Sequence, residues 1–296
     1  MKKVNLVMAF ILSITLFSGA VACKNNENEE VTLPPSSSIE ESLPPSNSLE
    51  EPIEPDEPND TPPAVETPPA SPPPVTPPVT EPPAPAKAEY IKSTANGVNI
   101  RSGAGTGFAV LGSAEKGTMY AIIGKTGSWY KTYYKNQTAY ISTSYATVLS
   151  LEKTQNEDVE KVISEGYKLI GVPYVYGAVR LHDGKGKFLS GFTAQKFDCS
   201  SLMQYIFYKG AGTLLDVTTR TQVKQGKAVK SGDLQRGDLM FFTNEQRQYN
   251  KGIERVGHVA LYLGDNYILH TASDYARIEP ISNKRWKFFI EARRFL

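Results

Sequence analysis

Cys199 is the residue of this chain whose type and position most directly suggest covalent chemistry. It stands in the stretch FDCSSLMQYIF, where apolar residues recur at the spacing of a helix with one buried face and Asp198 is a residue type that often caps helices. A cysteine at a helix start faces unpaired N–H groups and the positive end of the helix dipole, which predicts a thiol pKa below its ordinary value of about 8.5. The alternative is a small, buried core residue, which is the commoner role of a lone cysteine.

Two histidines further along the chain lie in a predicted β-hairpin. The segment VGHVALYLGDNYILHTAS has two alternating runs separated by the turn residues GDN. A three-residue loop pairs Leu263 with Tyr267 and places His270 opposite Ala260. His258 and His270 then share one face of the hairpin, about 7 to 8 Å apart at the backbone. A loop of two or four residues instead puts them on opposite faces.

These three side chains suit two kinds of site. In the first, His258 deprotonates Cys199 while His270 holds the imidazole of His258 in one tautomer and orientation. In the second, the three residues bind zinc and leave a fourth position open, although none has the close spacing of common zinc ligands. For the hairpin alone, two polar residues on a solvated strand face are the simpler interpretation. The third histidine, His182, lies in a polar loop and is predicted to be at the surface.

The first 22 residues predict export. Lys2 and Lys3 precede an apolar run that ends in small residues before Cys23. This pattern resembles a bacterial lipoprotein signal peptide, in which the cysteine is lipidated, although Ala20 stands where leucine is usual. Ordinary secretory cleavage and an uncleaved membrane span are the alternatives. If Cys23 carries lipid, Cys199 has no disulfide partner, and catalysis is the leading reason for an exported protein to keep a free thiol.

The segment after Cys23 is acidic and rich in proline. Of the 21 prolines, 19 lie between Pro34 and Pro85, and residues 25–86 hold thirteen acidic side chains and no Lys or Arg. Such a composition cannot form a core, so residues 23–87 are predicted to be a disordered linker. The rest of the chain carries 29 Lys and Arg against 18 Asp and Glu. A basic surface could attract an anionic polymer, but scattered solubilising charge explains the excess equally well, and no nucleic-acid partner is predicted.

Residues 88–150 are predicted to form a small barrel of short strands punctuated by glycines. The motifs NIRSGAGTGFAVLG, KGT, GSWYKTYY and TAYISTSY resemble the bacterial SH3-like domain and cover nearly all of this segment. The resemblance implies binding to the wall or to peptides, or help in shaping the cleft of an adjacent enzyme. We expect deletion of this domain to change substrate preference more than the folding of the residues C-terminal to it.

Residues 155–296 resemble the NlpC family of cell-wall cysteine peptidases. The motifs FDCSSLMQYIF, RGDLMFF, GHVALYLG and ILHTAS occur in the order found in that family. The resemblance implies an α+β papain-like fold, in which the nucleophile begins a helix that packs on an antiparallel sheet. It assigns Cys199 as nucleophile, His258 as general base and His270 as the third, orienting residue, with no metal or other cofactor. Ahead of these motifs, apolar spacing predicts a helix over residues 158–169.

The resemblance also implies a substrate and the residues that bind it. In members joined to SH3-like domains, a peptidoglycan stem peptide is cut between D-glutamate and the diamino acid. Tyr174 and Ser200 match positions that line the cleft, and Arg220 matches an arginine suited to bidentate binding of a carboxylate. Asp198 by itself would raise the pKa of the neighbouring thiol, so it is expected to bind a cation besides capping the helix. The resemblance implies that this cation is the free amine of the stem peptide's L-alanine.

The sequence thus predicts an extracytoplasmic, lipid-anchored, monomeric endopeptidase that acts on peptidoglycan stem peptides or muropeptides, with the diamino acid left open. Two departures from the family pattern concern specificity. Thr221 stands where relatives specialised for free amines often carry aspartate, and the loop over residues 178–196 is longer than usual. A non-catalytic wall-binding lipoprotein and a cysteine-dependent amidase or acyltransferase on wall peptides are the alternative functions.

Overall fold

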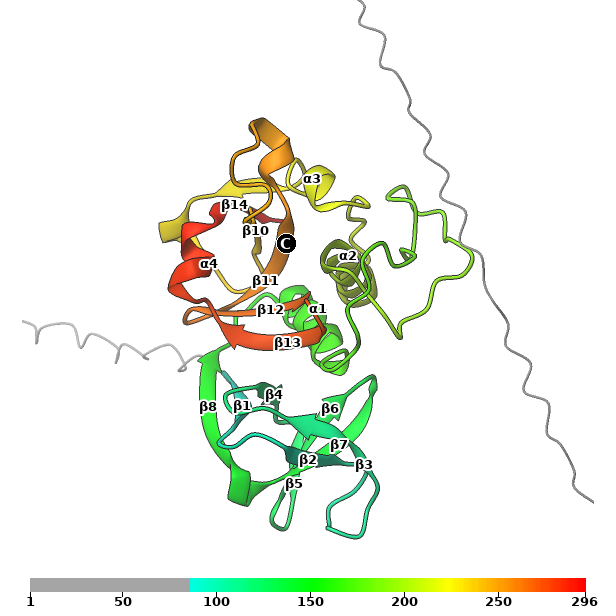
Figure 1. Ribbon diagram of the computed structural model, residues 1–296, viewed down its shortest axis with the longest axis vertical. Coiled ribbons are helices and arrows are strands. Elements are labelled where there is room, and N and C mark those ends of the chain that lie inside the picture. Colours follow the sequence, from blue (N-terminus) through cyan, green and yellow to red (C-terminus); the bar gives the residue numbers. More distant parts are fainter. Residues whose placement is uncertain (1–85) are drawn as a thin grey trace, which may run out of the picture. The chain divides into compact units, whose positions relative to one another are not determined.

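The structure is a computed structural model that describes residues 86–296 (Figure 1). The predicted signal peptide, Cys23 and nearly all of the predicted linker lie outside the described residues. Within residues 86–296, no helix is long and apolar enough to cross a membrane. By their contacts, the described residues all belong to one compact unit. We call residues 88–150 the barrel and residues 155–296 the C-terminal domain.

Two helices cover the sheet of the C-terminal domain. The predicted helix over residues 158–169 is confirmed as α1 (Glu157–Lys168), and α2 (Cys199–Ala211) begins at the predicted cysteine. The two helices pack closely, since a Cβ atom on Gly210 would lie 2.5 Å from the backbone of Val162. The C-terminal domain also has four short helical segments, α3 (Thr219–Gln222), α4 (Asn283–Lys287), η2 (Ser231–Asp233) and η3 (Gly252–Arg255). The barrel has one, η1 (Thr143–Tyr145).

An antiparallel sheet of nine strands carries the hairpin of the two histidines. Its order is β8-β1-β4-β13-β12-β11-β10-β14-β9. The six strands from the C-terminal domain are β9 (Lys227–Val229), β10 (Leu239–Phe242), β11 (His258–Gly264), β12 (Tyr267–Ala272), β13 (Tyr275–Pro280) and β14 (Phe289–Arg294). Helix α2 packs on β11 and β12. The predicted arrangement of a helix-start cysteine packed on an antiparallel sheet is therefore present.

The barrel contributes strands to two sheets. Five of its strands form a sheet of order β3-β2-β7-β6-β5, comprising β2 (Val98–Arg101), β3 (Val110–Ala114), β5 (Gly124–Thr126), β6 (Trp129–Tyr134) and β7 (Gln137–Ser142). The other three, β1 (Lys87–Ser93), β4 (Met119–Ala121) and β8 (Ala146–Glu152), belong to the nine-stranded sheet. Within this sheet, the two domains join where Met119 of β4 pairs with Ile278 of β13.

This shared sheet opposes the expectation that deletion of the barrel changes substrate preference more than the folding of the C-terminal domain. The backbone N–H groups of Lys135 and Asn136 donate to carbonyls of Ile170 and Lys168, at 2.8 and 2.7 Å. Removing the barrel would leave those acceptors and a strand edge of the C-terminal domain without partners. We therefore expect deletion to damage folding as well as any effect on substrate preference.

A buried arginine joins the two domains. Arg236, 8 % exposed, donates to both carboxylate oxygens of Glu160 (2.6 and 3.0 Å) and to the Leu263 carbonyl (2.7 Å). Its guanidinium also contacts the hydroxyls of Tyr90 in β1 and Tyr167 in α1, at 3.3 and 3.0 Å. The arginine of the RGDLMFF motif is thus a structural residue of the domain junction.

Replacing Arg236 with methionine is expected to lower the free energy of unfolding by about 3 to 5 kcal/mol, because Glu160 would keep a charge without its buried partner. Urea denaturation measures the change. The matched control is Arg293→Met, since Arg293 pairs with a half-exposed carboxylate, Glu291, and such pairs contribute at most about 1 kcal/mol. Equal losses in the two variants would contradict a special role for the junction.

The loop over residues 178–196 contains neither helix nor strand, but its side chains pack on α2. The prediction that His182 lies at the surface is wrong. Its side chain is fully buried, its ring packs edge-on against Tyr208, and its Nδ1 accepts from the Gly184 N–H at 3.0 Å. The polar composition of the loop concealed this, because the contact depends on an aromatic residue of α2 far along the chain.

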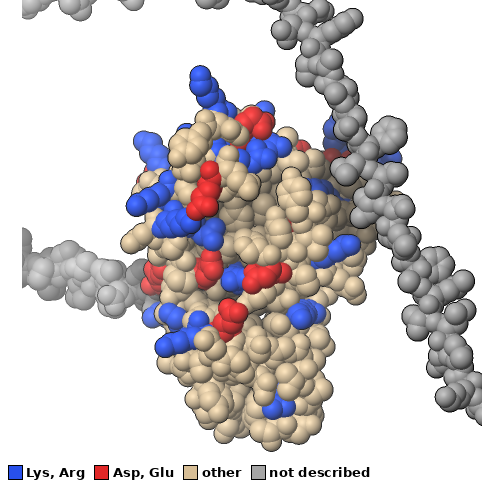
Figure 2. Space-filling view, viewed as in Figure 1, with Lys and Arg blue, Asp and Glu red and all other residues tan. Residues whose placement is uncertain are grey.

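Lys and Arg side chains are mixed with Asp and Glu on the face of the molecule in Figure 2. Several basic residues of the C-terminal domain have acidic neighbours, such as Lys284 with Glu245 and Arg285 with Glu279. On this face, the charge excess of the described chain is therefore distributed and does not form one continuous basic surface.

Candidate active site

Cys199 occupies the first position of α2, where local sequence holds it. Asp198 is the N-cap: its Oδ1 accepts from the Ser201 N–H at 2.8 Å, and Ser201 Oγ accepts from the Asp198 N–H at 2.9 Å. At the other end, Gly212 adopts a left-handed conformation (φ 66°) that ends the helix. The apolar face of Leu202, Met203, Ile206 and Phe207 is fully buried, which fixes the rotation of the helix and the direction of the cysteine.

The prediction of a lowered thiol pKa is wrong for this site. Burial raises the pKa of Cys199 to about 12, and the adjacent Asp198 carboxylate also raises it. Hydrogen bonds from the N–H groups of Val259, Ser200 and Cys199 act in the opposite direction and are outweighed. The helix-start effect is thus present, but the side chain is only 8 % exposed, and burial disfavours the charged thiolate more strongly. The resting site holds a neutral thiol.

We therefore expect alkylation of Cys199 by iodoacetamide to be slow at pH 7 and to accelerate about tenfold per pH unit up to pH 10, because only the thiolate reacts. Peptide mass spectrometry distinguishes this residue from Cys23, the other cysteine of the chain. An alkylation rate that is level from pH 6 to pH 9 would show a thiolate already formed at rest.

The hairpin turn differs from the predicted one, but the predicted facing of the histidines is confirmed. The loop has two residues, Asp265 and Asn266, both with positive φ (46° and 66°). A register shift between Tyr262 and Gly264 then restores the expected pairing of Leu261 with Leu269. One residue fewer in the loop and one extra residue in β11 cancel, so the two histidines stay on one face.

The imidazoles of His258 and His270 contact each other directly, and His270 in turn contacts the carboxylate of Glu279. His258 Nε2 lies 2.9 Å from His270 Nδ1, and His270 Nε2 lies 3.0 Å from Oε1 of Glu279 in β13. The guanidinium of Arg285, in α4, donates to the same Oε1 at 2.8 Å. Sequence reasoning missed Glu279 and Arg285. Alternation along β13 would have placed Glu279 on the same face as Arg277, the residue that pairs with His270.

The carboxylate determines the tautomer of both rings. An ionised carboxylate only accepts hydrogen bonds, so His270 Nε2 carries the proton and its Nδ1 is an acceptor. His258 Nε2 must then donate to that acceptor, which leaves His258 Nδ1 as the unprotonated, basic nitrogen. Both nitrogens of His270 are used in this chain of bonds, which disfavours the alternative in which His270 is a zinc ligand.

The charges of these groups depend on their surroundings. Burial lowers the pKa of His258 well below its ordinary value, and His270 and Arg285 lower it further. Burial also lowers the pKa of His270, although its hydrogen bond to Glu279 opposes this. For Glu279, burial acts upward, but the hydrogen bond with His270 and the nearby Arg285 bring its pKa down to about 2. At neutral pH the site holds two neutral imidazoles and one carboxylate.

Replacing Glu279 with glutamine is expected to lower kcat for a thiol-dependent reaction at this site by on the order of 10- to 100-fold with little change in KM. The value of kcat should fall because an amide can donate as well as accept and so no longer imposes the tautomer of His270. KM should change little because Glu279 does not line either of the two cavities that adjoin Cys199. Glu291→Gln is the matched control, because Glu291 also pairs with an arginine and is similarly exposed (36 % against 30 %). A rise in KM alone would contradict a positioning role.

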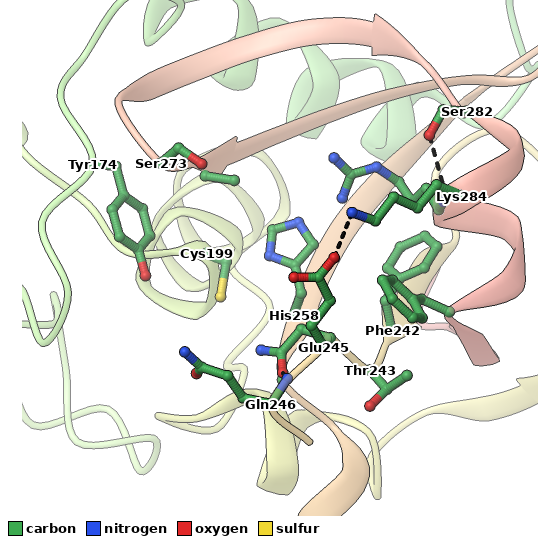
Figure 3. Close-up of a pocket in the computed structure, with 15 residues that line it drawn as sticks. Tyr174, Cys199, Phe242, Thr243, Glu245, Gln246, His258, Ser273, Ser282 and Lys284 are labelled. Atoms are coloured by element: carbon green, nitrogen blue, oxygen red, sulfur yellow. Dashed lines mark hydrogen bonds and ion pairs between the residues drawn. The ribbon is translucent and has the colours of Figure 1, made fainter. Parts of the chain in front are cut away.

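Cys199 lies between two cavities. The first, about 670 Å³, contains His258 and the ion pair of Glu245 with Lys284 (2.5 Å). The second, about 370 Å³, contains three arginines, Arg180, Arg220 and Arg247, and we call it the arginine cavity. Figure 3 shows Cys199 between the side chains of Tyr174 and His258. The nucleophile candidate therefore has room for substrate on both sides.

The predicted substrate-binding residues gather at the arginine cavity, which is lined by Tyr174, Asp198, Ser200 and Arg220. Tyr174 is placed by a bridge with Phe197 and has its pKa raised to about 12, chiefly by burial, so its hydroxyl stays protonated. Arg220 lies 3.6 Å from Glu254. Thr221 does not line the cavity, since its hydroxyl bonds to Thr218 in the cap of α3.

The fold and the site define an α+β domain built around a helix-start cysteine and a histidine pair. Residues 171–294 match the NlpC/P60 family, and residues 96–147 match the bacterial SH3 domain. The chain thus contains an NlpC/P60 domain preceded by a bacterial SH3 domain, as the sequence motifs indicated.

Several known proteins are similar to this chain. Peptidoglycan endopeptidase RipA of Mycolicibacterium smegmatis is 33 % identical over 127 residues, which is 42 % of this chain and 24 % of RipA. A gamma-D-glutamyl-L-lysine dipeptidyl-peptidase of Bacillus subtilis is 30 % identical over 165 residues, covering 56 % of this chain and 48 % of that protein. The chain thus spans less than half the length of these relatives. The crystal structure of an NlpC/P60 family protein from Bacillus cereus aligns with a TM-score of 0.37 at 24 % identity, over 71 % of this chain and 64 % of that one.

Proposed function

We propose that this protein is a peptidoglycan hydrolase, a cysteine endopeptidase that cuts stem peptides between γ-D-glutamate and the diamino acid. The observation that carries the proposal is the directional chain of bonds from Glu279 through His270 to His258. It leaves Nδ1 of His258 as the basic nitrogen of a residue that lines the same cavity as Cys199. The names of the relatives, a peptidoglycan endopeptidase and a γ-D-glutamyl-L-lysine dipeptidyl-peptidase, support the choice of substrate class.

In this mechanism His258 acts as a general base. It removes the thiol proton as Cys199 attacks the scissile carbonyl, because the resting thiol is neutral. The imidazolium that forms is stabilised by His270 and, beyond it, by the carboxylate of Glu279. The N–H groups at the start of α2 lie beside the sulfur and are suited to stabilise the oxyanion. His258 then protonates the leaving amine, and the C–N bond breaks to give an acyl-enzyme. In the second half of the reaction His258 takes a proton from a water molecule, which attacks the acyl-enzyme and releases the product acid and the free thiol.

The reaction is tested by digestion of defined muropeptides with the purified full chain and mass spectrometry of the products. Cleavage between D-glutamate and the diamino acid, with a gain of one water, supports the proposal. Products that gain an added amine instead would indicate acyl transfer, and cleavage at another amide would reassign the bond. Comparing muropeptides with diaminopimelate and with lysine determines the diamino acid.

We further propose that the protein works outside the cytoplasm as a monomer, held to the membrane by lipid on Cys23. The apolar run before Cys23 and the absence of a disulfide partner for Cys199 among residues 86–296 support this placement. Labelling of the expressed full chain with a fatty-acid analogue tests it. Labelling that persists in the Cys23→Ala variant would contradict lipidation at this residue.

A further inference from the structure

The arginine cavity contains a buried carboxylate that the sequence predicted to bind the free amine of a stem peptide. The side chain of Asp198 is 3 % exposed and lies at the start of α2, beside Cys199. Its acceptor capacity decides whether an ammonium group can bind there, because an ionised carboxylate offers about four lone-pair sites.

All four sites of Asp198 are already used by the protein. Oδ1 accepts from the Ser201 N–H at 2.8 Å and from Ser200 Oγ at 3.1 Å. Oδ2 accepts from Arg180 Nη2 at 2.9 Å and from the Gly177 N–H at 3.2 Å. A substrate ammonium would have to displace one of these donors, and the only one that carries a compensating charge is Arg180.

Arg180 is not free to leave. It comes from the long loop over residues 178–196, and its Nε donates to the Val217 carbonyl at 2.8 Å. Its Nη1 donates to the Ala178 carbonyl at 2.9 Å, and its side chain is only 20 % exposed. Moving the guanidinium would leave these two carbonyls and a buried carboxylate without their donors, which is costly.

The charge of the cavity also disfavours a cation. Arg180, Arg220 and Arg247 face two carboxylates, Asp198 and Glu254, so the arrangement carries an excess of one positive charge. Glu254 is exposed and lies 3.6 and 3.5 Å from Arg220 and Arg247, which places it between two partners. A protonated amino terminus entering the cavity would meet net repulsion, whereas a neutral amide would not.

We propose that this end of the cleft selects stem peptides whose alanine nitrogen is acylated, as in stems still attached to glycan, and discriminates against peptides with a free amino terminus. Arg180 is the specificity-determining residue, since it takes the place that a substrate ammonium would fill. This inference rests on the proposed function. It departs from the expectation that Asp198 binds the amine, and it favours endopeptidase over dipeptidyl-peptidase activity, because release of a dipeptide from a peptide terminus requires a site for the ammonium.

The test compares two substrates that differ only at that nitrogen, the free tripeptide L-alanyl-γ-D-glutamyl-diamino acid and the same tripeptide N-acylated by muramic acid. For the full-length protein, we expect kcat/KM to be at least about tenfold higher for the acylated peptide. In Arg180→Gln the carboxylate loses its charged partner, and this ratio is expected to fall at least about tenfold through a lower KM for the free peptide. Arg180→Lys keeps the positive charge and is expected to retain the preference.

Arg293→Gln is the matched control, since Arg293 is also 20 % exposed and pairs with a carboxylate at 2.8 Å but lines neither cavity. Its ratio should equal that of the unaltered protein. A preference of the unaltered protein for the free peptide, or equal rates on both, would overturn the inference without requiring any variant to fold. Failure to cleave either peptide would overturn the proposed function, and the inference with it.

Discussion

Replacing Cys199 with alanine is expected to reduce kcat/KM for stem-peptide cleavage by at least on the order of 10⁴-fold, to the limit of detection. The sulfur belongs to a residue that lines both cavities, and it lies beside the N–H groups of the α2 start. Without it no acyl-enzyme forms, and the remaining groups can only bind the substrate. Release of soluble peptides from purified peptidoglycan, followed by mass spectrometry, measures the loss.

Cys199→Ser provides the sharper comparison, because it keeps nearly the same volume in a position that is 8 % exposed. A hydroxyl is a far weaker acid than a thiol, so His258 is not expected to activate it and the activity should be similarly low. Both variants should keep the unfolding temperature of the unaltered chain within a few degrees, which rules out loss of structure as the cause. Stem-peptide release at a tenth or more of the normal rate by either variant would remove Cys199 from the mechanism.

The second large effect is expected at His258, where alanine should lower kcat/KM by on the order of 10³- to 10⁴-fold. Because burial raises the pKa of the thiol to about 12, spontaneous ionisation at pH 7 is rare, and a base must take the proton during attack. The variant should therefore regain activity as the pH rises towards 10, whereas the unaltered enzyme should vary little between pH 7 and 9. Added imidazole should restore part of the activity at pH 7.

His182→Asn serves as the control, since His182 is a buried histidine outside the cleft and is expected to affect stability without this change in pH dependence. For the unaltered enzyme, activity should fall only when the pH drops below the lowered pKa of His258, because protonation removes the basic nitrogen. If kcat/KM of His258→Ala were lower than that of the unaltered enzyme by the same factor at every pH, the role of His258 as general base would be contradicted.

Local features of the site were readable from the sequence because they depend on residues a few positions apart. The position of Cys199 at a helix start followed from apolar spacing and a capping residue, and the structure adds the reciprocal bonds of Asp198 and Ser201. The shared face of His258 and His270 followed from strand alternation, and their nitrogens lie 2.9 Å apart. The family motifs identified both domains for the same reason, since they record short local patterns.

The turn between the histidines shows how far such reasoning extends. The loop was predicted to have three residues, and it has two, because Asp265 and Asn266 both adopt the positive φ that a tight hairpin turn requires. A bulge within β11 adds one residue to that strand, so His258 and His270 share a face although the predicted loop length was wrong. Bulges depend on the fit of the whole sheet, and alternation within one strand does not reveal them.

By itself, the sequence determined which residues could react, the helix and hairpin that carry them, and the order of the two domains. Only the tertiary structure decided how those residues are charged and supported. Burial of Cys199 reverses the expected direction of its pKa shift, and Glu279 and Arg285 reach the histidines from a later strand and helix. Arg180 donates one of the four hydrogen bonds that occupy the Asp198 carboxylate, and it comes from a loop whose path no sequence periodicity predicts. Charge and acceptor capacity depend on everything within a few ångströms, and most of those neighbours are distant in the chain.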